Sequence, residues 1–211
     1  LYNKGERNKD YHINEFRNNM DYAQKIADRY GLSLKQNKLK YFQPFLNETA
    51  EDQNIKDIKD LFQTGHTHHQ AGNLEAASQL YQNILDQQPT HVDANFLLGT
   101  LNLQQGNLDT AATLLKKAIA LKPGHVRAHS NLGTTLKEQD RLDEAIECYG
   151  RSIDLNPDYA EAHYNLGTIL QKQGKHDKAV ASYNRAIKIN PYYADAYYDI
   201  GTVHQEQDKV N

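Results

Sequence analysis

Three histidines near residue 66 are the first side chains in the sequence whose spacing suggests specific chemistry. The run reads His66-Thr67-His68-His69. On a helix, His66 and His69 share a face because they are three residues apart, whereas His68 points elsewhere. Two imidazoles are too few ligands for a structural zinc site, and no cysteine or carboxylate lies at ligand spacing nearby. We therefore expect a polar helix surface here, with no metal ion and no cofactor.

The other groups that could take part in catalysis are single or dispersed. Cys148 is the only cysteine, so an internal disulfide is impossible. Its place beside Tyr149 on an expected helix favours a packing role over a reactive thiol. The sequence has no glycine-rich phosphate loop, no nucleophile elbow and no isolated carboxylate pair in an apolar context. Acidic residues such as Asp143 and Glu144 fall at helix starts, where they complement the helix dipole. We expect no enzyme activity.

His129 and His163 occupy the same place in a phrase that repeats every 34 residues. The phrase is clearest over residues 126–157 and 160–191. It recurs from Val92, more loosely from Ile58, and begins once more at Ala194. Four of the five prolines follow the same period: Pro89, Pro123, Pro157 and Pro191. A fixed period of this length predicts stacked supersecondary units. Both histidines would lie where neighbouring units pack, so we expect packing rather than catalysis.

Each period contains two helical patterns that face each other. In the unit 160–193 the apolar and small positions recur every three or four residues; they are Leu166, Gly167, Leu170, Ala179, Tyr183 and Ala186. Gly167 and Ala179 are small where two helix axes must approach closely. Tyr183 fills the remaining space and contributes about 1.5–3 kcal/mol if it is fully buried.

The two helices of a unit are separated by a residue suited to a left-handed turn. This residue is Gly174 in the unit 160–193. The equivalent residues are Gly72, Gly106, Asp140 and Asp208, of which the aspartates adopt this conformation less readily. The proline at the end of each unit stops the second helix and starts another hairpin.

The pattern L-G-x-x-[L/Y], A-x-x-x-[Y/F/L] and P resembles the tetratricopeptide repeat (TPR) family. The resemblance covers five units within residues 49–211, which we number from first to fifth: 58–91, 92–125, 126–159, 160–193 and the partial 194–211. It implies an all-α fold, a right-handed α-solenoid of stacked helix-turn-helix units. Its first helices would line a concave groove that binds other polypeptides. The position of the family's bulky aromatic near each unit's start is occupied here by Leu61, Asn95, His129, His163 and Tyr197, so the first four units depart from the family pattern.

The face of the first helices that points away from the second helices is the expected binding surface, here called the groove face. Aligning the units gives three rows: Phe62, Phe96, Ser130, Tyr164, Tyr198; Gln63, Leu97, Asn131, Asn165, Asp199; and His66, Thr100, Thr134, Thr168, Thr202. The candidate binding residues are Phe62, Phe96, Asn131, Thr134, Tyr164, Asn165, Thr168, Tyr198 and Asp199.

Asn131 and Asn165 carry the strongest case for binding, because an amide both donates and accepts hydrogen bonds. Side chains of this kind, one period apart, could pair with the backbone of an extended peptide without reading its sequence. The phrases AHSNLG and AHYNLG resemble repeats of O-linked N-acetylglucosamine transferases, whose superhelix carries an asparagine ladder. Tyr164 and Tyr198 favour binding too, since aromatic residues are enriched at contact surfaces. The alternative is that these are ordinary solvated polar positions.

Charge and hydropathy exclude several kinds of partner. The sequence has 24 Lys and Arg against 27 Asp and Glu, a net charge of −3, whereas a nucleic-acid partner requires a basic face. No run approaches the roughly 18 apolar residues of a membrane span, and no signal peptide is visible. Arg127, Lys137 and Lys172 are not clustered, so we do not expect a clamp for acidic tails. We expect a cytoplasmic protein and leave an extracellular location open.

Residues 1–48 do not match the repeat and are expected to form a separate N-terminal helical element. Apolar residues recur every three or four positions between Asp10 and Tyr30, which predicts an amphipathic helix ended by Gly31. Its apolar face could cap the first repeat, dock into another copy of the chain to build an oligomer, or contact a domain outside this sequence.

Three functions remain open at this stage. The first is a non-catalytic scaffold that binds a peptide or protein segment in the groove. The second is a structural protein that assembles into homo-oligomers or filaments through its N-terminal helix and the open fifth unit, whose first helix offers Tyr197, Ile200 and His204 to a second helix that the sequence lacks. The third is the substrate-recruiting region of a longer enzyme, such as a glycosyltransferase.

Overall fold

The computed structural model describes residues 57–208, and every regular element among them is an α-helix. The first helix of the first unit occupies residues 57–70 of this range. It is followed by α3 (Leu74–Gln87), α4 (Val92–Gln104), α5 (Leu108–Leu121), α6 (Val126–Glu138), α7 (Leu142–Leu155), α8 (Ala160–Lys172), α9 (His176–Ile189) and α10 (Ala194–Asp208). The predictions for the N-terminal element, residues 1–48, lie outside the described residues.

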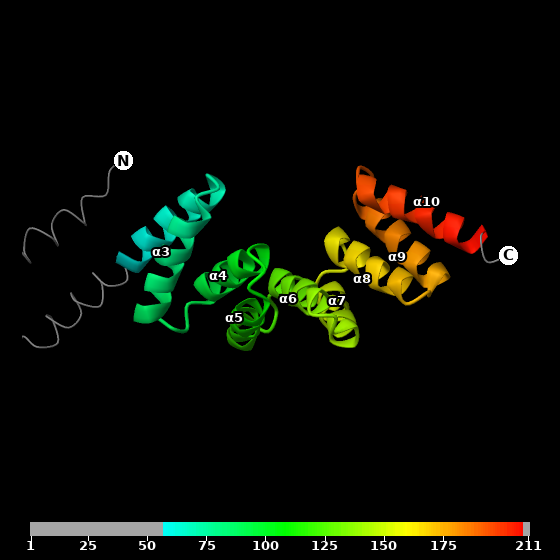
Figure 1. Cartoon of the computed structure of the whole chain (residues 1–211). Helices are drawn as coiled ribbons and strands as arrows, with labels where there is room; N and C mark the ends of the chain where they lie inside the picture. Colours follow the sequence, from blue (N-terminus) through cyan, green and yellow to red (C-terminus); the bar gives the residue numbers. More distant parts are fainter. Residues whose placement is uncertain (1–56, 209–211) are drawn as a thin grey trace, which may run out of the picture. The chain divides into compact units, whose positions relative to one another are not determined.

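The helices pack in the order of the sequence, as the repeat predicts (Figure 1). The most extensive contacts join α4 to α5, α6 to α7 and α8 to α9, which are the two helices of the second, third and fourth units. The first helices of neighbouring units also touch, since α6 contacts both α4 and α8, and α8 contacts α10. The predicted α-solenoid of stacked helix-turn-helix units is therefore confirmed.

Glycines allow the close approach of the two helices within a unit. A Cβ atom added to Gly167 would lie 2.6 Å from the Tyr183 ring, and one added to Gly133 would lie 2.8 Å from the Tyr149 ring. Both tyrosines are fully buried. Because protein interiors are packed as tightly as organic crystals, the ring uses the space that a side chain would need. The predicted contact of Gly167 with Tyr183 is thus confirmed.

The turns between paired helices adopt the left-handed conformation. Gly72 and Gly106 have φ of 76°, and Gly174 has φ of 71°. Asp140 has φ of 59° and is the one non-glycine residue with positive φ in the part of the chain that the structure describes. An L-residue in this conformation costs about 1–2 kcal/mol, which aspartate tolerates better than most. The last predicted turn residue, Asp208, is instead the final residue of α10.

Polar side chains at the start of the first helices bind the carbonyl group of the preceding proline. The bonds run from Asn95 Nδ2 to Pro89 O (3.1 Å), from His129 Nε2 to Pro123 O (2.9 Å) and from His163 Nε2 to Pro157 O (3.0 Å). Because a carbonyl oxygen only accepts, Nε2 carries the proton in both histidines. These residues replace the family's aromatic side chain with a hydrogen bond that ties each unit to the next, in keeping with the expected packing role.

Candidate functional site

The first row of the groove face packs at the junctions between units. The Phe62 ring lies 5.3 Å from the His91 ring, the Phe96 ring 4.5 Å from the His125 ring, and the Tyr164 ring 4.9 Å from the Tyr193 ring. In every pair the partner stands 29 residues later, immediately before the next unit's first helix. A solenoid unit must bury one face against its neighbour, and these aromatic pairs do so.

Phe96 consequently differs from the sequence-based expectation. It is only 4% exposed and belongs to the buried core cluster, whereas the sequence predicted its row to lie on the binding surface. The Arg127 guanidinium group lies over its ring at 5.2 Å, as in a cation–π contact. In the third unit the row residue is Ser130, which is fully buried, and Tyr159 packs against the same cluster. At the other end, Tyr198 is 74% exposed.

Hydrogen bonds between adjacent first helices cross the groove face. Asn131 Nδ2 donates to Thr100 Oγ1 at 2.9 Å, which joins α6 to α4. The Tyr164 hydroxyl donates to Asp199 Oδ2 at 3.0 Å, which joins α8 to α10. These bonds fix the orientation of Asn131, Tyr164 and Asp199 before any partner binds.

Two amide groups on this face are left with unused hydrogen-bonding capacity. Among the described residues, Asn131 Oδ1 has no donor, and the Asn165 side chain has no partner for either its oxygen or its nitrogen. Both side chains are half-buried. Half-buried amides without partners can accept from and donate to a peptide backbone that lies over them.

The threonine row is engaged in internal bonds. Thr134 Oγ1 lies 3.0 Å from the hydroxyl group of Tyr149, and Thr168 Oγ1 donates to the carbonyl of Asn165 at 2.8 Å. Burial raises the pKa of Tyr149, so its phenol stays protonated. The threonines therefore form part of the floor of the groove face and leave the amides as its unpaired groups.

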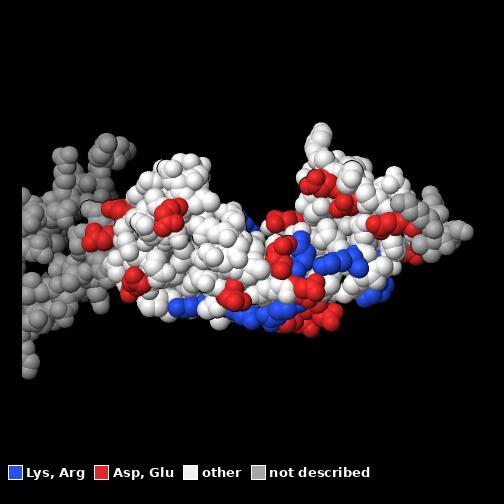
Figure 2. Space-filling view, viewed as in Figure 1, with Lys and Arg blue, Asp and Glu red and all other residues white. Residues whose placement is uncertain are grey.

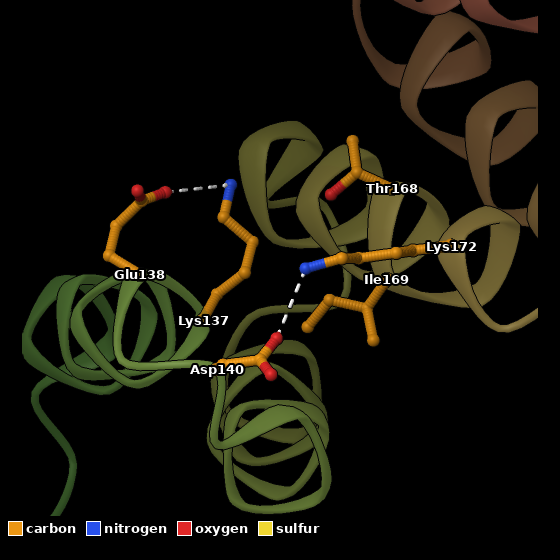
Figure 3. A pocket seen from close by; sticks show the side chains of 6 residues that line it. All are labelled: Lys137, Glu138, Asp140, Thr168, Ile169 and Lys172. Carbon is orange, nitrogen blue, oxygen red and sulfur yellow. Dashed lines mark hydrogen bonds and ion pairs between the residues drawn. The ribbon is translucent and has the colours of Figure 1, made fainter.

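A hollow of about 450 Å³ opens between α6 and α8 (Figure 3). It is lined by Lys137, Glu138, Asp140, Thr168, Ile169 and Lys172. The structure thus brings together two of the cations that the sequence left apart. However, Lys172 Nζ lies 3.1 Å from Asp140 Oδ1, and Lys137 Nζ lies 3.6 Å from Glu138 Oε1. On the face seen in Figure 2, basic and acidic side chains likewise lie side by side, without a continuous basic stripe.

The other residues considered for chemistry have structural surroundings. His68 lies beside Asn73, with 3.5 Å between its Nδ1 and Asn73 Nδ2. Within residues 57–208, no group of three or more His, Cys, Asp or Glu is placed to hold a metal ion. Cys148 is half-buried, and burial raises the pKa of its thiol to about 11, so the thiol is protonated at neutral pH.

The architecture described so far defines a class, the helical repeat proteins that present one face of stacked helices. Models described as tetratricopeptide repeat match residues 62–126, 114–147 and 160–193, and one described as TPR repeat matches 133–174. The chain is 30% identical to MamA in its crystal structure, with a TM-score of 0.63, over 68% of this chain and 84% of that one. The chain belongs to the tetratricopeptide repeat family.

Two further solved structures show how much of this chain, and of the similar proteins, the structural similarity covers. The Thermobaculum terrenum O-GlcNAc transferase mutant K341M is 30% identical, with a TM-score of 0.57, over 63% of this chain but only 26% of that one. YrrB, a TPR protein with an unusual peptide-binding site, is 21% identical, with a TM-score of 0.62, over 76% of this chain and 83% of that one, and shows the fold alone. No curated protein matches the sequence significantly.

Within the described residues, no helix combines the length and the apolar character needed to cross a membrane.

Sequence reasoning missed the junction partners His91, His125, Tyr159 and Tyr193. A signal for them was present, because these residues form a column with the same period as the rest of the repeat. His91 and His125 have a second role there, since their Nδ1 atoms accept hydrogen bonds from the backbone N–H groups of Ala94 and Ala128. An imidazole that both caps a helix and packs on an aromatic ring is not evident from residue type alone.

Proposed function

We propose that this chain is a non-catalytic scaffold that binds an extended peptide or protein segment along the groove face. The observation that carries this proposal is the pair of half-buried amides, Asn131 and Asn165, with unused donors and acceptors one repeat apart. The backbone of an extended segment offers a carbonyl and an N–H group at each residue, which matches amides placed at intervals. Such pairing tolerates many sequences.

The remaining candidate residues divide into two roles under this proposal. Phe62 and Phe96 shape the floor from within the junctions, whereas Tyr198 offers an exposed aromatic ring to the partner. Tyr164 and Asp199 are already joined to each other, so they present a fixed polar edge. Groups held in place before binding lose little conformational entropy on association, which favours affinity.

The test uses peptides selected from a random-sequence library displayed on phage. For selected peptides, the double variant Asn131→Ala and Asn165→Ala should raise Kd about tenfold, since each lost hydrogen bond contributes about 0.5–1.5 kcal/mol. The matched control is Asn184→Ala, an exposed asparagine on the second helix α9. The far-ultraviolet circular dichroism should be unchanged in both. Equal affinity of the double variant and the control would contradict the proposal.

Self-assembly is the second candidate, and one observation favours it. A Cβ atom on Gly201 would meet nothing within 4 Å, whereas the equivalent Gly167 and Gly133 each face a tyrosine ring of a second helix. Tyr197 on the same helix is 53% exposed. A helix from another copy could cover this face, and such head-to-tail contacts give rings or filaments. Light scattering of the chain with and without residues 1–48 tests this, and a monomer in both samples would exclude it.

A further inference from the structure

The first unit contains a buried hydroxyl group without a hydrogen-bond partner. Tyr81 on α3 is fully buried, and its phenolic oxygen has no partner among the described residues. Buried polar groups in native proteins are nearly always paired, so an unpaired one requires an explanation. Burial raises the pKa of Tyr81 to about 12, so the phenol keeps its proton and can donate a hydrogen bond.

The equivalent tyrosines of other units show where this hydroxyl points. The Tyr149 hydroxyl lies 3.0 Å from Thr134 Oγ1, and the Tyr183 hydroxyl donates to Gln171 Oε1 at 2.8 Å. Both partners stand on the first helix of the same unit, either in a row of the groove face or one turn further along. A tyrosine at this repeat position therefore directs its hydroxyl through the helix pair toward the groove face.

In the first unit, the positions of those two partners are held by His66 and His69. The His69 ring lies edge-on to the Tyr81 ring at 6.3 Å, and the Phe62 ring, two turns earlier on the same helix, lies 6.0 Å from the Tyr81 ring. Burial and the neighbouring His66 lower the pKa of His69, so this imidazole is neutral at pH 7. The site therefore combines a phenol donor with imidazole groups that can donate from one nitrogen and accept at the other.

We propose that Tyr81, together with His66 and His69, binds a backbone carbonyl oxygen of the segment that lies on the groove face. This inference rests on the proposed function and adds a specific hydrogen-bonding site in the first unit, two units before Asn131. The uncharged Tyr81 phenol and His69 imidazole suit an uncharged acceptor better than a carboxylate, which would favour a protonated imidazole. The His69 ring, which lies edge-on to the Tyr81 ring, is half-buried, and helix-surface side chains change rotamer within picoseconds to nanoseconds, so its movement would admit the oxygen atom.

The test is Tyr81→Phe in the full chain, measured with the phage-selected peptides whose affinity depends on Asn131 and Asn165. The variant should raise Kd about fivefold, the typical loss for one neutral hydrogen bond. Its thermal midpoint should stay equal or rise, because the deleted hydroxyl has no hydrogen-bond partner among residues 57–208. The matched control is Tyr149→Phe, which deletes a paired hydroxyl and should lower the thermal midpoint.

A second pair of variants examines the imidazoles. His69→Ala should weaken the same peptides, whereas His68→Ala should not, since His68 lies beside Asn73. Unchanged affinity in both Tyr81→Phe and His69→Ala, with the Asn131 and Asn165 dependence intact, would overturn this inference and leave the proposed function standing. If no selected peptide depends on Asn131 and Asn165, the proposed function fails and this inference fails with it.

Discussion

The junction between the second and third units and the junction between the fourth and fifth units occupy the same place in the repeat but differ in chemistry. In the former, Phe96 is buried against His125. In the latter, Tyr164 stacks on Tyr193 and donates to Asp199. Both junctions therefore place an aromatic ring against the ring of a residue 29 positions later. They differ in polarity, because the partner ring and the surrounding hydrogen bonds are not the same. One junction is closed by apolar burial and the other is tied by a hydrogen bond at its edge.

The largest expected effect is the loss of the buried ring. Phe96→Ala should lower the free energy of unfolding by about 3–5 kcal/mol, because it removes a large core side chain and leaves a cavity. Tyr164→Ala should lower it by less, because Tyr164 is only half-buried. Urea unfolding followed by circular dichroism measures both. A larger loss for Tyr164→Ala would reverse the proposed division between the two junctions.

Glycine substitutions sharpen the comparison within the fourth and fifth units themselves. Gly167→Ala places a Cβ atom 2.6 Å from the Tyr183 ring, and overpacking of this kind costs about 1–3 kcal/mol. Gly201→Ala meets nothing within 4 Å of the added atom and should stabilise α10 by up to about 1 kcal/mol, the difference in helix propensity.

In thermal unfolding, Gly167→Ala should lower the midpoint temperature and Gly201→Ala should raise it. If Gly201→Ala destabilises the chain instead, a group outside the described residues packs against α10 at that point. If that group belongs to another copy of the chain, the destabilisation caused by Gly201→Ala should depend on protein concentration, which would support self-assembly.

A smaller effect is expected from the hydrogen bond at the junction between the fourth and fifth units. Tyr164→Phe removes a donor to the Asp199 carboxylate and should cost about 1 kcal/mol, at the low end for bonds to charged groups because the pair is partly exposed. Tyr193→Phe is the matched control, since the described residues offer its hydroxyl no hydrogen bond. Equal losses in the two variants, measured by urea unfolding, would show that ring packing alone maintains this junction.

The helix pairs could be predicted from the sequence because residue size and period determine them. Gly167 and Tyr183 recur at a fixed offset, and only one arrangement of two helices brings a ring over a residue without a side chain. The left-handed turns could be predicted as well, because glycine at positions 72, 106 and 174 adopts positive φ readily. Both features depend on contacts within one unit.

The junctions could not be predicted in the same way, because they depend on how one unit is rotated against the next. Phe96 shares a row with Tyr198, yet Phe96 is 4% exposed and Tyr198 is 74% exposed. The approach of Lys137 to Lys172 and the bond from Asn131 to Thr100 have the same origin. Whether the amides of Asn131 and Asn165 bind a partner remains a prediction from their residue type and their unused hydrogen-bonding groups.

The smallest expected effect is a pH dependence at the junction between the second and third units, which the junction of Tyr164 with Tyr193 should lack. His125 Nδ1 accepts a hydrogen bond from the Ala128 N–H group at 3.2 Å, which requires an unprotonated Nδ1. Burial, with Lys122 next in importance, lowers the pKa of His125 below its usual value of about 6.5. The unfolded chain then binds a proton more readily than the folded one, so the contribution of His125 is complete above about pH 6.5 and is lost as pH falls toward the folded-state pKa.

Urea midpoints at about pH 7.5 and about pH 5.5 should therefore differ less in His125→Asn than in the wild type, because asparagine also caps helices but does not titrate in this range. Some dependence should persist, since the pKa of His69 is lowered as well. His129→Asn is the control, because His129 donates from Nε2 to the Pro123 carbonyl and asparagine makes the equivalent bond at Asn95. A pH dependence in His125→Asn equal to that of the wild type would mean that the junction of Phe96 with His125 is no more sensitive to acid than the junction of Tyr164 with Tyr193.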